Sequence, residues 1–419
     1  MASASGVIRR TLLSTESGVS TLRTLLQSEL GTLRQAPVLL IASSDPSTNS
    51  NSTNDRLITT STPLKSVADS CQFVHFTLGQ QFGLRTVETK ISSAFPTLSD
   101  VEQRIELIRR TGASSIVAVG SGAAMDLAKA VQSEMQQKCD NNNSDTNIAR
   151  VIMVPSTWGG VLASGTSHSL LLDGAEETLV ALPRRNQEMM SNVSEDDAGV
   201  GISDDKVTTV VAPLEAKYME PLTAERFDAM LYVAAALLLD AAYRNSNHPL
   251  LPSLLETTTD LFFLEQDSEN DLSSAAARIE LTKLFYQSAS LVSYGLPGDP
   301  GDRSICMALA ASLIPRLFPE MHALSFFASL VPGLCHVIQE RDISNPQLER
   351  LVFEVLGSGG VGGRLPIPSF EIQDDSLQGF SIPDMALSHI QSNQTVWKCL
   401  DVPDDVLIQV LEHSMTKKP

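Results

Sequence analysis

Residues 115–129 read SIVAVGSGAAMDLAK: an apolar run, a turn at Gly120, Ser121 and Gly122, and a stretch of helical character. A short apolar run closed by a turn is typical of a strand buried on both faces of a parallel sheet. A glycine turn here lets backbone N–H groups approach a phosphate, and the following helix adds the partial positive charge of its N-terminus. Met125 stands where the complete dinucleotide fingerprint has a third glycine, so the spacing fits a phosphate site or a plain tight turn equally well.

Strands and helices alternate on both sides of this stretch. Strand candidates are residues 38–42, 73–76 and 150–155. Residues 96–110 carry apolar positions at helical spacing, with Ser99 or Asp100 as the expected N-cap. This order predicts an α/β fold with a doubly wound, Rossmann-like parallel sheet.

The character of the chain changes beyond about residue 213. Segments with helical spacing follow one another, separated by prolines and glycines: residues 227–243, 251–264, 274–294, 304–317 and 323–339. A chain of 419 residues is too long for one ordinary core. We therefore expect an α/β nucleotide-binding domain over residues 1–211 and an all-α domain over residues 212–419.

The composition of the chain excludes some classes of binding partner. The 30 basic and 49 acidic residues give a formal net charge of −19, which disfavours nucleic acid as a partner. No uncharged apolar run reaches the roughly 18 residues of a membrane-spanning helix, so no membrane partner is expected. The five cysteines are odd in number and none forms a C-x-x-C pair, which favours a reducing compartment. The sequence leaves the oligomeric state open, with a homodimer as one option.

The N-terminus has two interpretations. Residues 1–14 contain Arg9 and Arg10, several serines and threonines and no acidic residue, as mitochondrial transit peptides do. An ordinary first segment leading to the strand at 38–42 is the alternative. We therefore expect a cytoplasmic protein and keep a mitochondrial location open.

A second candidate site follows the strand at 150–155. There the chain reads PSTWGG (155–160), which places the hydroxyls of Ser156 and Thr157 where ligand crevices open in such sheets. Trp158 could offer a face for stacking. The alternative is an ordinary loop rich in small residues.

In order, these segments resemble the iron-dependent alcohol dehydrogenase family, which includes maleylacetate reductases and is related in fold to dehydroquinate synthase. The family stretch G-G-G-S-x-x-D-x-A-K corresponds to residues 120–129, with Asp126 and Lys129 in place, and its P-T-T-x-G-[TS] stretch to residues 155–160. Residues 221–230, PLTAERFDAM, resemble the segment that carries the first metal ligand. The resemblance extends from about Val38 to about His413.

The resemblance implies an NAD(P)-dependent oxidoreductase acting on a small alcohol, aldehyde or ketone. Its cofactor would be NAD or NADP, with Gly120, Ser121 and Gly122 against the pyrophosphate. The side chains expected to line the same crevice are those of Asp126, Lys129, Ser156 and Thr157. Choice between the two cofactors stays open, because Asp45 could bind a ribose hydroxyl and a serine at the strand end could tolerate a 2′-phosphate.

The resemblance also implies a divalent metal, iron or zinc, held by one Asp and three His. In this chain the four positions fall on Asp228, Tyr232, Ala308 (Met307 with one insertion) and His322. Only Asp228 and His322 are usual ligands for these metals, so we expect a partial site and weak metal binding. Residues that could complete it in three dimensions are Asp302, Cys306 and His336.

Without a metal, other groups must assist hydride transfer. His322 could donate the proton and Tyr232 could add a second hydroxyl. Arg303 and Arg316 could bind a substrate carboxylate, or be structural. The alternative hypothesis is a catalytically degenerate relative that binds a nucleotide without turnover.

Overall fold

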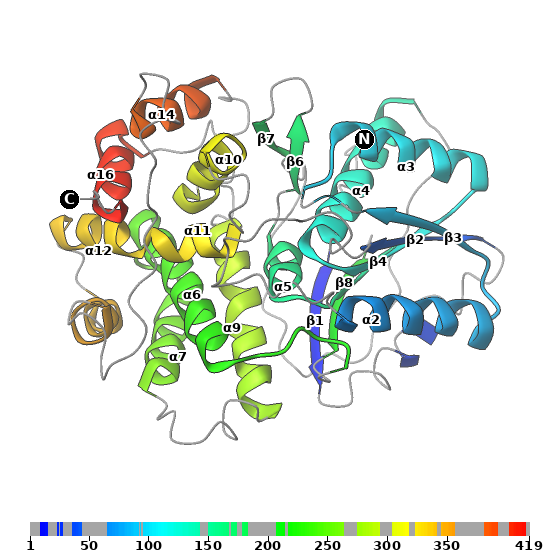
Figure 1. Cartoon of the computed structure of the whole chain (residues 1–419), viewed down its shortest axis with the longest axis horizontal. Helices are drawn as coiled ribbons and strands as arrows, with labels where there is room; N and C mark the ends of the chain where they lie inside the picture. The colour runs from blue at the N-terminus through cyan, green and yellow to red at the C-terminus, as the bar shows by residue number, and fades with distance from the viewer. Residues whose placement is uncertain are drawn as a thin grey trace, which may run out of the picture.

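The chain has an α/β half built on one parallel sheet and a helical half beside it (Figure 1). The computed structural model describes residues 9–15, 23–24, 26–27, 36–43, 65–91, 93, 95–142, 150–166, 169–173, 178–182, 207–213, 217–263, 275–293, 304–317, 323–341, 345–356, 381–392 and 402–415.

All strands of the large sheet are parallel. In spatial order they are β1 (Arg9–Thr15), β8 (Val207–Pro213), β5 (Arg150–Pro155), β4 (Ser115–Gly120), β2 (Val38–Ser43) and β3 (Thr86–Ile91). The chain steps outward from β2 to β3 and then returns past β2 to β4, so the strand order reverses between β2 and β4. In open sheets of this type, ligands bind beyond the carboxyl ends of the strands at such a reversal.

Helices cover both faces of the sheet, as the alternation predicts. On one face Val117 and Val119 of β4 pack with Val74 of α2 (Lys65–Phe76). On the other face the intervening residues of β4 pack with α3 (Leu98–Thr111) and α4 (Gly122–Asn142). Figure 1 shows α2 on one side of the sheet and α3 and α4 on the other. Because both faces are buried, each central strand is a continuous apolar run.

The strand predicted at residues 73–76 is wrong. These residues form the end of α2, which continues into the π-helical turn η3 (Thr77–Gln81), and the outer strand is β3. Val74 and Leu78 are both buried at helical spacing against the sheet. A four-residue apolar run does not distinguish a strand from one face of a helix.

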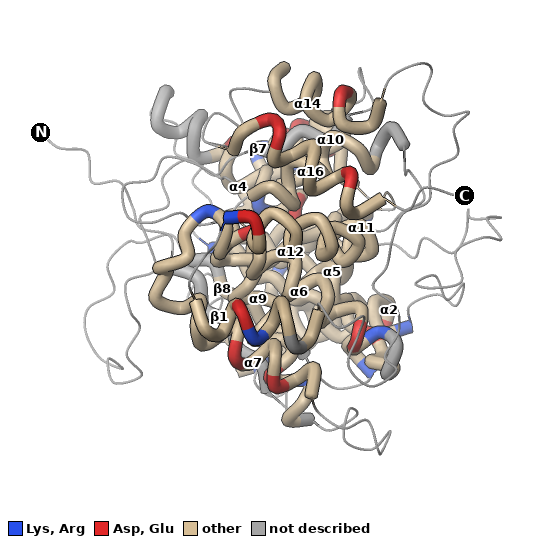
Figure 2. The backbone as a smooth tube through the Cα atoms, turned by 90° about the vertical axis from the view of Figure 1, so that its left-hand side faces the viewer, with Lys and Arg blue, Asp and Glu red and all other residues tan. Residues whose placement is uncertain are grey.

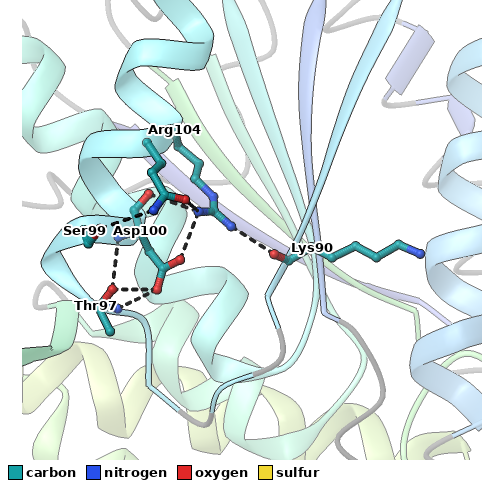
Figure 3. Close-up of polar contacts among 6 residues, drawn as sticks. Lys90, Thr97, Ser99, Asp100 and Arg104 are labelled. Carbon is teal, nitrogen blue, oxygen red and sulfur yellow. Dashed lines mark hydrogen bonds and ion pairs between the residues drawn. The ribbon is translucent and has the colours of Figure 1, made fainter. Parts of the chain in front are cut away.

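The start of α3 is fixed by a capping box (Figure 3). Asp100 N donates to the Thr97 hydroxyl at 3.0 Å, and Thr97 N donates to the Asp100 carboxylate at 2.9 Å. Arg104, 2.9 Å from Asp100, also donates to a backbone carbonyl near the end of β3. The N-cap is therefore Thr97, not Ser99 or Asp100, because Asp100 serves as the acidic partner three residues later.

A short antiparallel hairpin lies at the edge of the α/β half. Its strands are β6 (Ser169–Asp173) and β7 (Thr178–Leu182). Leu172 N donates to Pro96 O at 2.7 Å, so the hairpin is tied to the start of α3. Helix α5 (Trp158–Gly165) precedes the hairpin and packs against α9 of the helical half.

The helical half is built around α6 (Ala224–Arg244), whose residues 230–243 are buried on every side. Its other elements are α7 (Leu251–Phe263), α9 (Ala275–Ser293), α10 (Ile305–Leu317), α11 (Ala323–Ser329), α12 (Val331–Glu340), α13 (Pro346–Glu349), η4 (Arg350–Leu356), α14 (Ile382–Ser392) and α16 (Asp404–Ser414). The helix predicted over residues 323–339 is in fact two helices, with Pro332 in the first turn of the second.

The residues at both ends of the predicted α/β domain take part in the sheet. Arg9 and Arg10 lie in β1, paired with Val207 and Thr208 of β8. Strand β8 ends at Pro213, just past the predicted boundary at residue 211.

Seen from the helical side, charged positions of the described backbone are scattered singly or in small groups, with acidic and basic ones interspersed (Figure 2). Among the described helices, none combines the length and the apolar character needed to cross a membrane.

Candidate functional site

The glycine turn lies at the reversal of strand order, where β2 and β4 end side by side. Ser121 N donates to Ser43 Oγ at 2.9 Å, and the hydroxyl oxygens of Ser43 and Ser121 are 2.9 Å apart. Gly120 has a φ of 120°, and a Cβ there would lie 2.5 Å from Ser43 Oγ. Position 120 therefore accepts only glycine without a shift of β2 or of the turn.

The two motifs found in the sequence meet at this point. Ser156 N donates to Gly120 O at 2.9 Å. A Cβ on Gly160 would lie 2.8 Å from Gly120 O, and one on Gly122 would lie 3.2 Å from Gly159 O. The turn at 120–122 and the segment 155–160 are thus packed backbone to backbone, which requires their small residues.

The side chains of the second motif point inward rather than into an open crevice. Thr157 is the N-cap of α5, and its hydroxyl accepts a hydrogen bond from Gly160 N at 3.0 Å. Ser156 is fully buried, and its hydroxyl has no hydrogen-bond partner in the described part of the chain. Trp158 is also fully buried, so the stacking face expected from the sequence is not exposed.

The N-terminus of α5 already holds a carboxylate, which no sequence pattern signalled. Trp158 N donates to Glu220 Oε2 at 3.1 Å, and Glu220 Oε1 lies 2.9 Å from a guanidinium nitrogen of Arg226. Glu220 N also donates to Ser156 O at 2.9 Å. A negative charge at this end of a helix is favourable, so Glu220 occupies the anion position that α5 would otherwise offer.

Asp126 and Lys129 are buried, and their side chains lie near the C-terminal end of α5. Lys129 Nζ lies 2.8 Å from the Asp126 carboxylate and donates to Ala163 O at 2.6 Å and to Thr166 Oγ1 at 2.9 Å. Burial raises the pKa of Asp126 from its ordinary value of 3.8, and the nearby Lys129 opposes this rise. The pair thus places a cation among the last carbonyls of α5, where a positive charge is favourable.

The proposed metal positions lie on α6 and α10. Asp228 and Tyr232 are 4% and 3% exposed, and the Tyr232 ring packs on Phe262 of α7 at a centroid distance of 5.4 Å. Met307 and Ala308 are buried in α10. His322, Arg303 and Asp302 lie outside the described residues, and so does the side chain of Arg316.

Two residues that could have completed a metal site have other contacts. The Cys306 thiol donates to Ala236 O at 3.7 Å, and burial raises its pKa well above the ordinary value. His336 lies on α12, 3.3 Å from Glu340, and its ring stacks on that of His413 at 3.6 Å. In the described part of the chain, no three His, Cys, Asp or Glu side chains are grouped so that they could hold a metal ion.

Comparisons with known proteins agree on the architecture. A family model for iron-containing alcohol dehydrogenases matches residues 76–179, and no curated protein sequence matches the chain. An iron-containing alcohol dehydrogenase from Thermotoga maritima is 11% identical with a TM-score of 0.61, covering 98% of this chain and 99% of its own. NADH-dependent butanol dehydrogenase A from the same organism is 12% identical with a TM-score of 0.62, covering 98% of both chains. A maleylacetate reductase from Agrobacterium tumefaciens is 12% identical with a TM-score of 0.56, covering 99% of this chain and 97% of its own.

The chain has the fold of the iron-containing alcohol dehydrogenases. This confirms both the resemblance inferred from the sequence and the predicted order of an α/β half and a helical half. The family match includes both motifs of the candidate nucleotide site, residues 120–129 and 155–160. It ends before α6, which carries Asp228 and Tyr232.

At the positions that the sequence resemblance assigns to a metal, the side chains of this chain do not fit a divalent ion. Asp228 supplies a carboxylate, but the next position on α6 is a phenol in apolar packing. The position on α10 is Ala308 or Met307, and neither offers the nitrogen or oxygen ligands that iron and zinc prefer. Even with His322, the family positions supply only two usual ligands.

Proposed function

We propose that the chain is an NAD(P)-dependent oxidoreductase acting on a small alcohol, aldehyde or ketone. The observation that carries this proposal is the glycine turn after β4, set at the reversal of strand order in an iron-containing alcohol dehydrogenase fold. The fold relative named as an NADH-dependent butanol dehydrogenase supports a nicotinamide cofactor and a small alcohol or aldehyde as the substrate class.

The backbone of Gly120, Ser121 and Gly122 would hold the pyrophosphate of the cofactor. These residues fit a phosphate group, since the turn has no Cβ at two of its three positions and leads into the N-terminus of a long helix. Ser43, which already bonds to Ser121 N, adds a hydroxyl from β2 to the same site. The bound cofactor would donate a hydride to the substrate carbon in its reduced form, or accept one from it in its oxidised form.

The contacts of Asp126, Lys129 and Thr157 favour an indirect role in this function. The first two hold the end of α5 and the third caps its start, so they would set where α5 lies beside the glycine turn. We assign the proton donor to His322, because the Tyr232 side chain is packed against Phe262. An imidazole is the side chain best suited to exchange protons near neutral pH.

The second candidate is a degenerate relative that binds a nucleotide without turnover. The apolar side chain of Ala308 or Met307 in α10, at a position that the resemblance assigns to a metal ligand, favours this candidate, because it cannot polarise a carbonyl. The nucleotide site is the same in both proposals, and only the chemistry beside it differs.

Isothermal titration of the purified chain with NADH and NADPH, with and without iron or zinc, tests the proposal. We expect one nucleotide to bind without added metal. Gly120→Ala should abolish binding, because the new Cβ would lie 2.5 Å from Ser43 Oγ, whereas the control Gly79→Ala, which meets nothing within 4 Å, should leave it unchanged. Absence of binding by the parent chain would refute both candidates.

Turnover separates the two candidates. Consumption of NADH or NADPH with a panel of small aldehydes and ketones, abolished by His322→Ala but not by the exposed control Glu102→Ala, would support the oxidoreductase. Tight binding without turnover would support the degenerate relative. A homodimer and a cytoplasmic or mitochondrial location remain proposals from the sequence, testable by light scattering and by cell fractionation.

A further inference from the structure

A buried carboxylate joins the central helix of the helical half to α10. Asp240 lies on α6 and is fully buried. Its Oδ2 accepts hydrogen bonds from Ser304 Oγ at 2.7 Å and from Cys306 N at 3.1 Å. Its Oδ1 lies 3.0 Å from Arg244 Nε, one turn further along the same helix. Every contact of this carboxylate is charge-assisted, the stronger class of hydrogen bond.

These bonds complete the first turn of α10. Met307 N donates to Ser304 Oγ at 3.1 Å, so Ser304 caps the helix while Asp240 takes the N–H of Cys306. A negative charge at the N-terminus of α10 is favoured by the helix dipole. Arg244 balances that charge and also donates to Val292 O at 3.2 Å, which ties α9 to the same point.

A metal at the family positions would join the same two helices. Asp228 and Tyr232 lie on α6, and Ala308 lies one turn from Ser304 on α10, to which it donates a backbone hydrogen bond at 3.0 Å. Tyr232 and Asp240 are eight residues apart on α6, about 12 Å along the helix axis at 1.5 Å per residue. These metal positions and the Asp240 contact therefore lie on the same pair of helices, with about two helical turns between Tyr232 and Asp240 along α6.

We infer that Asp240, and not a divalent metal, joins α6 to α10 in this chain. Three observations lead to this inference: the carboxylate is fully buried with both oxygens bonded, its charge is balanced by Arg244, and the metal positions on the same two helices include Tyr232 and Ala308. Cys306, the nearest soft ligand, donates its thiol hydrogen to Ala236 O at 3.7 Å. The inference concerns the stability of the helical half and does not depend on whether a nucleotide binds.

The test compares the thermal stability of the full chain and its variants with and without metal. The chain should keep its melting temperature after treatment with EDTA and after addition of iron or zinc. Asp240→Asn should lower it by about 3–6 °C, because the Arg244 charge is left buried without its partner. The matched control Asp260→Asn removes a carboxylate that is 64% exposed and 3.5 Å from Arg350, and should change it little.

Metal content of the purified chain keeps the inference falsifiable if Asp240→Asn does not fold. Elemental analysis should find far less than one iron or zinc per chain. Metal bound at about one per chain, released by EDTA with a fall in melting temperature and absent from Asp228→Asn, would overturn the inference. A melting temperature for Asp240→Asn equal to that of the control would overturn it as well. Nucleotide titration is a separate measurement. It therefore distinguishes a failure of the proposed nucleotide site from a failure of the inference that Asp240 joins α6 to α10.

Discussion

Replacing Lys129 by methionine should destabilise the chain strongly. Methionine has a similar length and keeps the apolar packing, but removes the charge and the donors. The Lys129 side chain is 1% exposed, and its ammonium lies 2.8 Å from Asp126 and 2.6 Å from Ala163 O. Lys129→Met therefore leaves a buried carboxylate without its counter-charge and removes the cation from the end of α5.

The expected size of the effect follows from this burial. Removing one partner of a buried ion pair costs about 3–5 kcal/mol, because the other charge is left in a medium of low dielectric constant. For a chain of this size, that corresponds to a fall in melting temperature of roughly 3–6 °C. Asp126→Asn combined with Lys129→Met should recover part of the loss. A neutral amide can still accept the backbone hydrogen bond from Leu170 that Asp126 receives.

Thermal and denaturant unfolding of the parent, the two single variants and the double variant form a complete double-mutant cycle. We expect a coupling energy of more than about 1 kcal/mol between the two positions. The reasoning is refuted if Lys129→Met is as stable as the parent but has lost NADH affinity. That result would mean that Lys129 contacts the cofactor directly, as its place in the sequence motif implies.

The loss of stability caused by Lys129→Met should also depend on pH. Burial raises the pKa of Asp126, and Lys129 is the main group that lowers it, so the variant should have a still higher pKa at this position. A carboxyl whose folded pKa lies above its unfolded value favours the folded state at low pH, and this advantage is lost as pH rises through the folded pKa. Lys129→Met should therefore be closer to the parent at about pH 5 than at about pH 8.

Three further predictions concern the rest of the α/β half. Gly120→Ala should cost about 2 kcal/mol or more of stability and be partly rescued by Ser43→Gly, which removes the two atoms that its Cβ would meet most closely; no rescue would contradict the steric argument. Asp100→Ala should cost about 1–2 kcal/mol by denaturant unfolding, because it removes a capping box and an ion pair, whereas Glu102→Ala, exposed on the same helix, should cost little. Burial raises the pKa of Cys71 to about 12, so iodoacetamide at about pH 8 should label it only in the unfolded chain, and rapid labelling of the native chain would be the contrary result.

The centre of the α/β half was predictable because its signals are local. A strand buried on both faces must be apolar throughout, a close turn at its end needs small residues, and the helix that follows has its own periodicity. Residues 115–129 contain all three signals in sequence. Where the signal was short the prediction failed, as at residues 73–76, whose four side chains suit a strand or a helix face equally well.

The contacts made by the polar side chains were not predictable in the same way. Asp126 and Lys129 stand beside the glycine turn in sequence, yet Lys129 bonds to residues 34 and 37 positions away, at the end of α5. Glu220 reaches across 62 residues to the start of the same helix, and Ser43 across 78 to the glycine turn. No local pattern signals such contacts, because each depends on how separate strands and helices are placed together.

The sequence by itself therefore determined the central strands β2, β4 and β5 and most of the long helices, whereas β1, β3 and β8 were not predicted from it. Tertiary structure alone decided what the remaining polar groups do. Asp240 meets Ser304 and Cys306 only because α6 and α10 cross at that point. The physical reason is that secondary structure follows from backbone bonds and apolar periodicity along the chain, whereas a buried charge must find its partner wherever the packed elements place one.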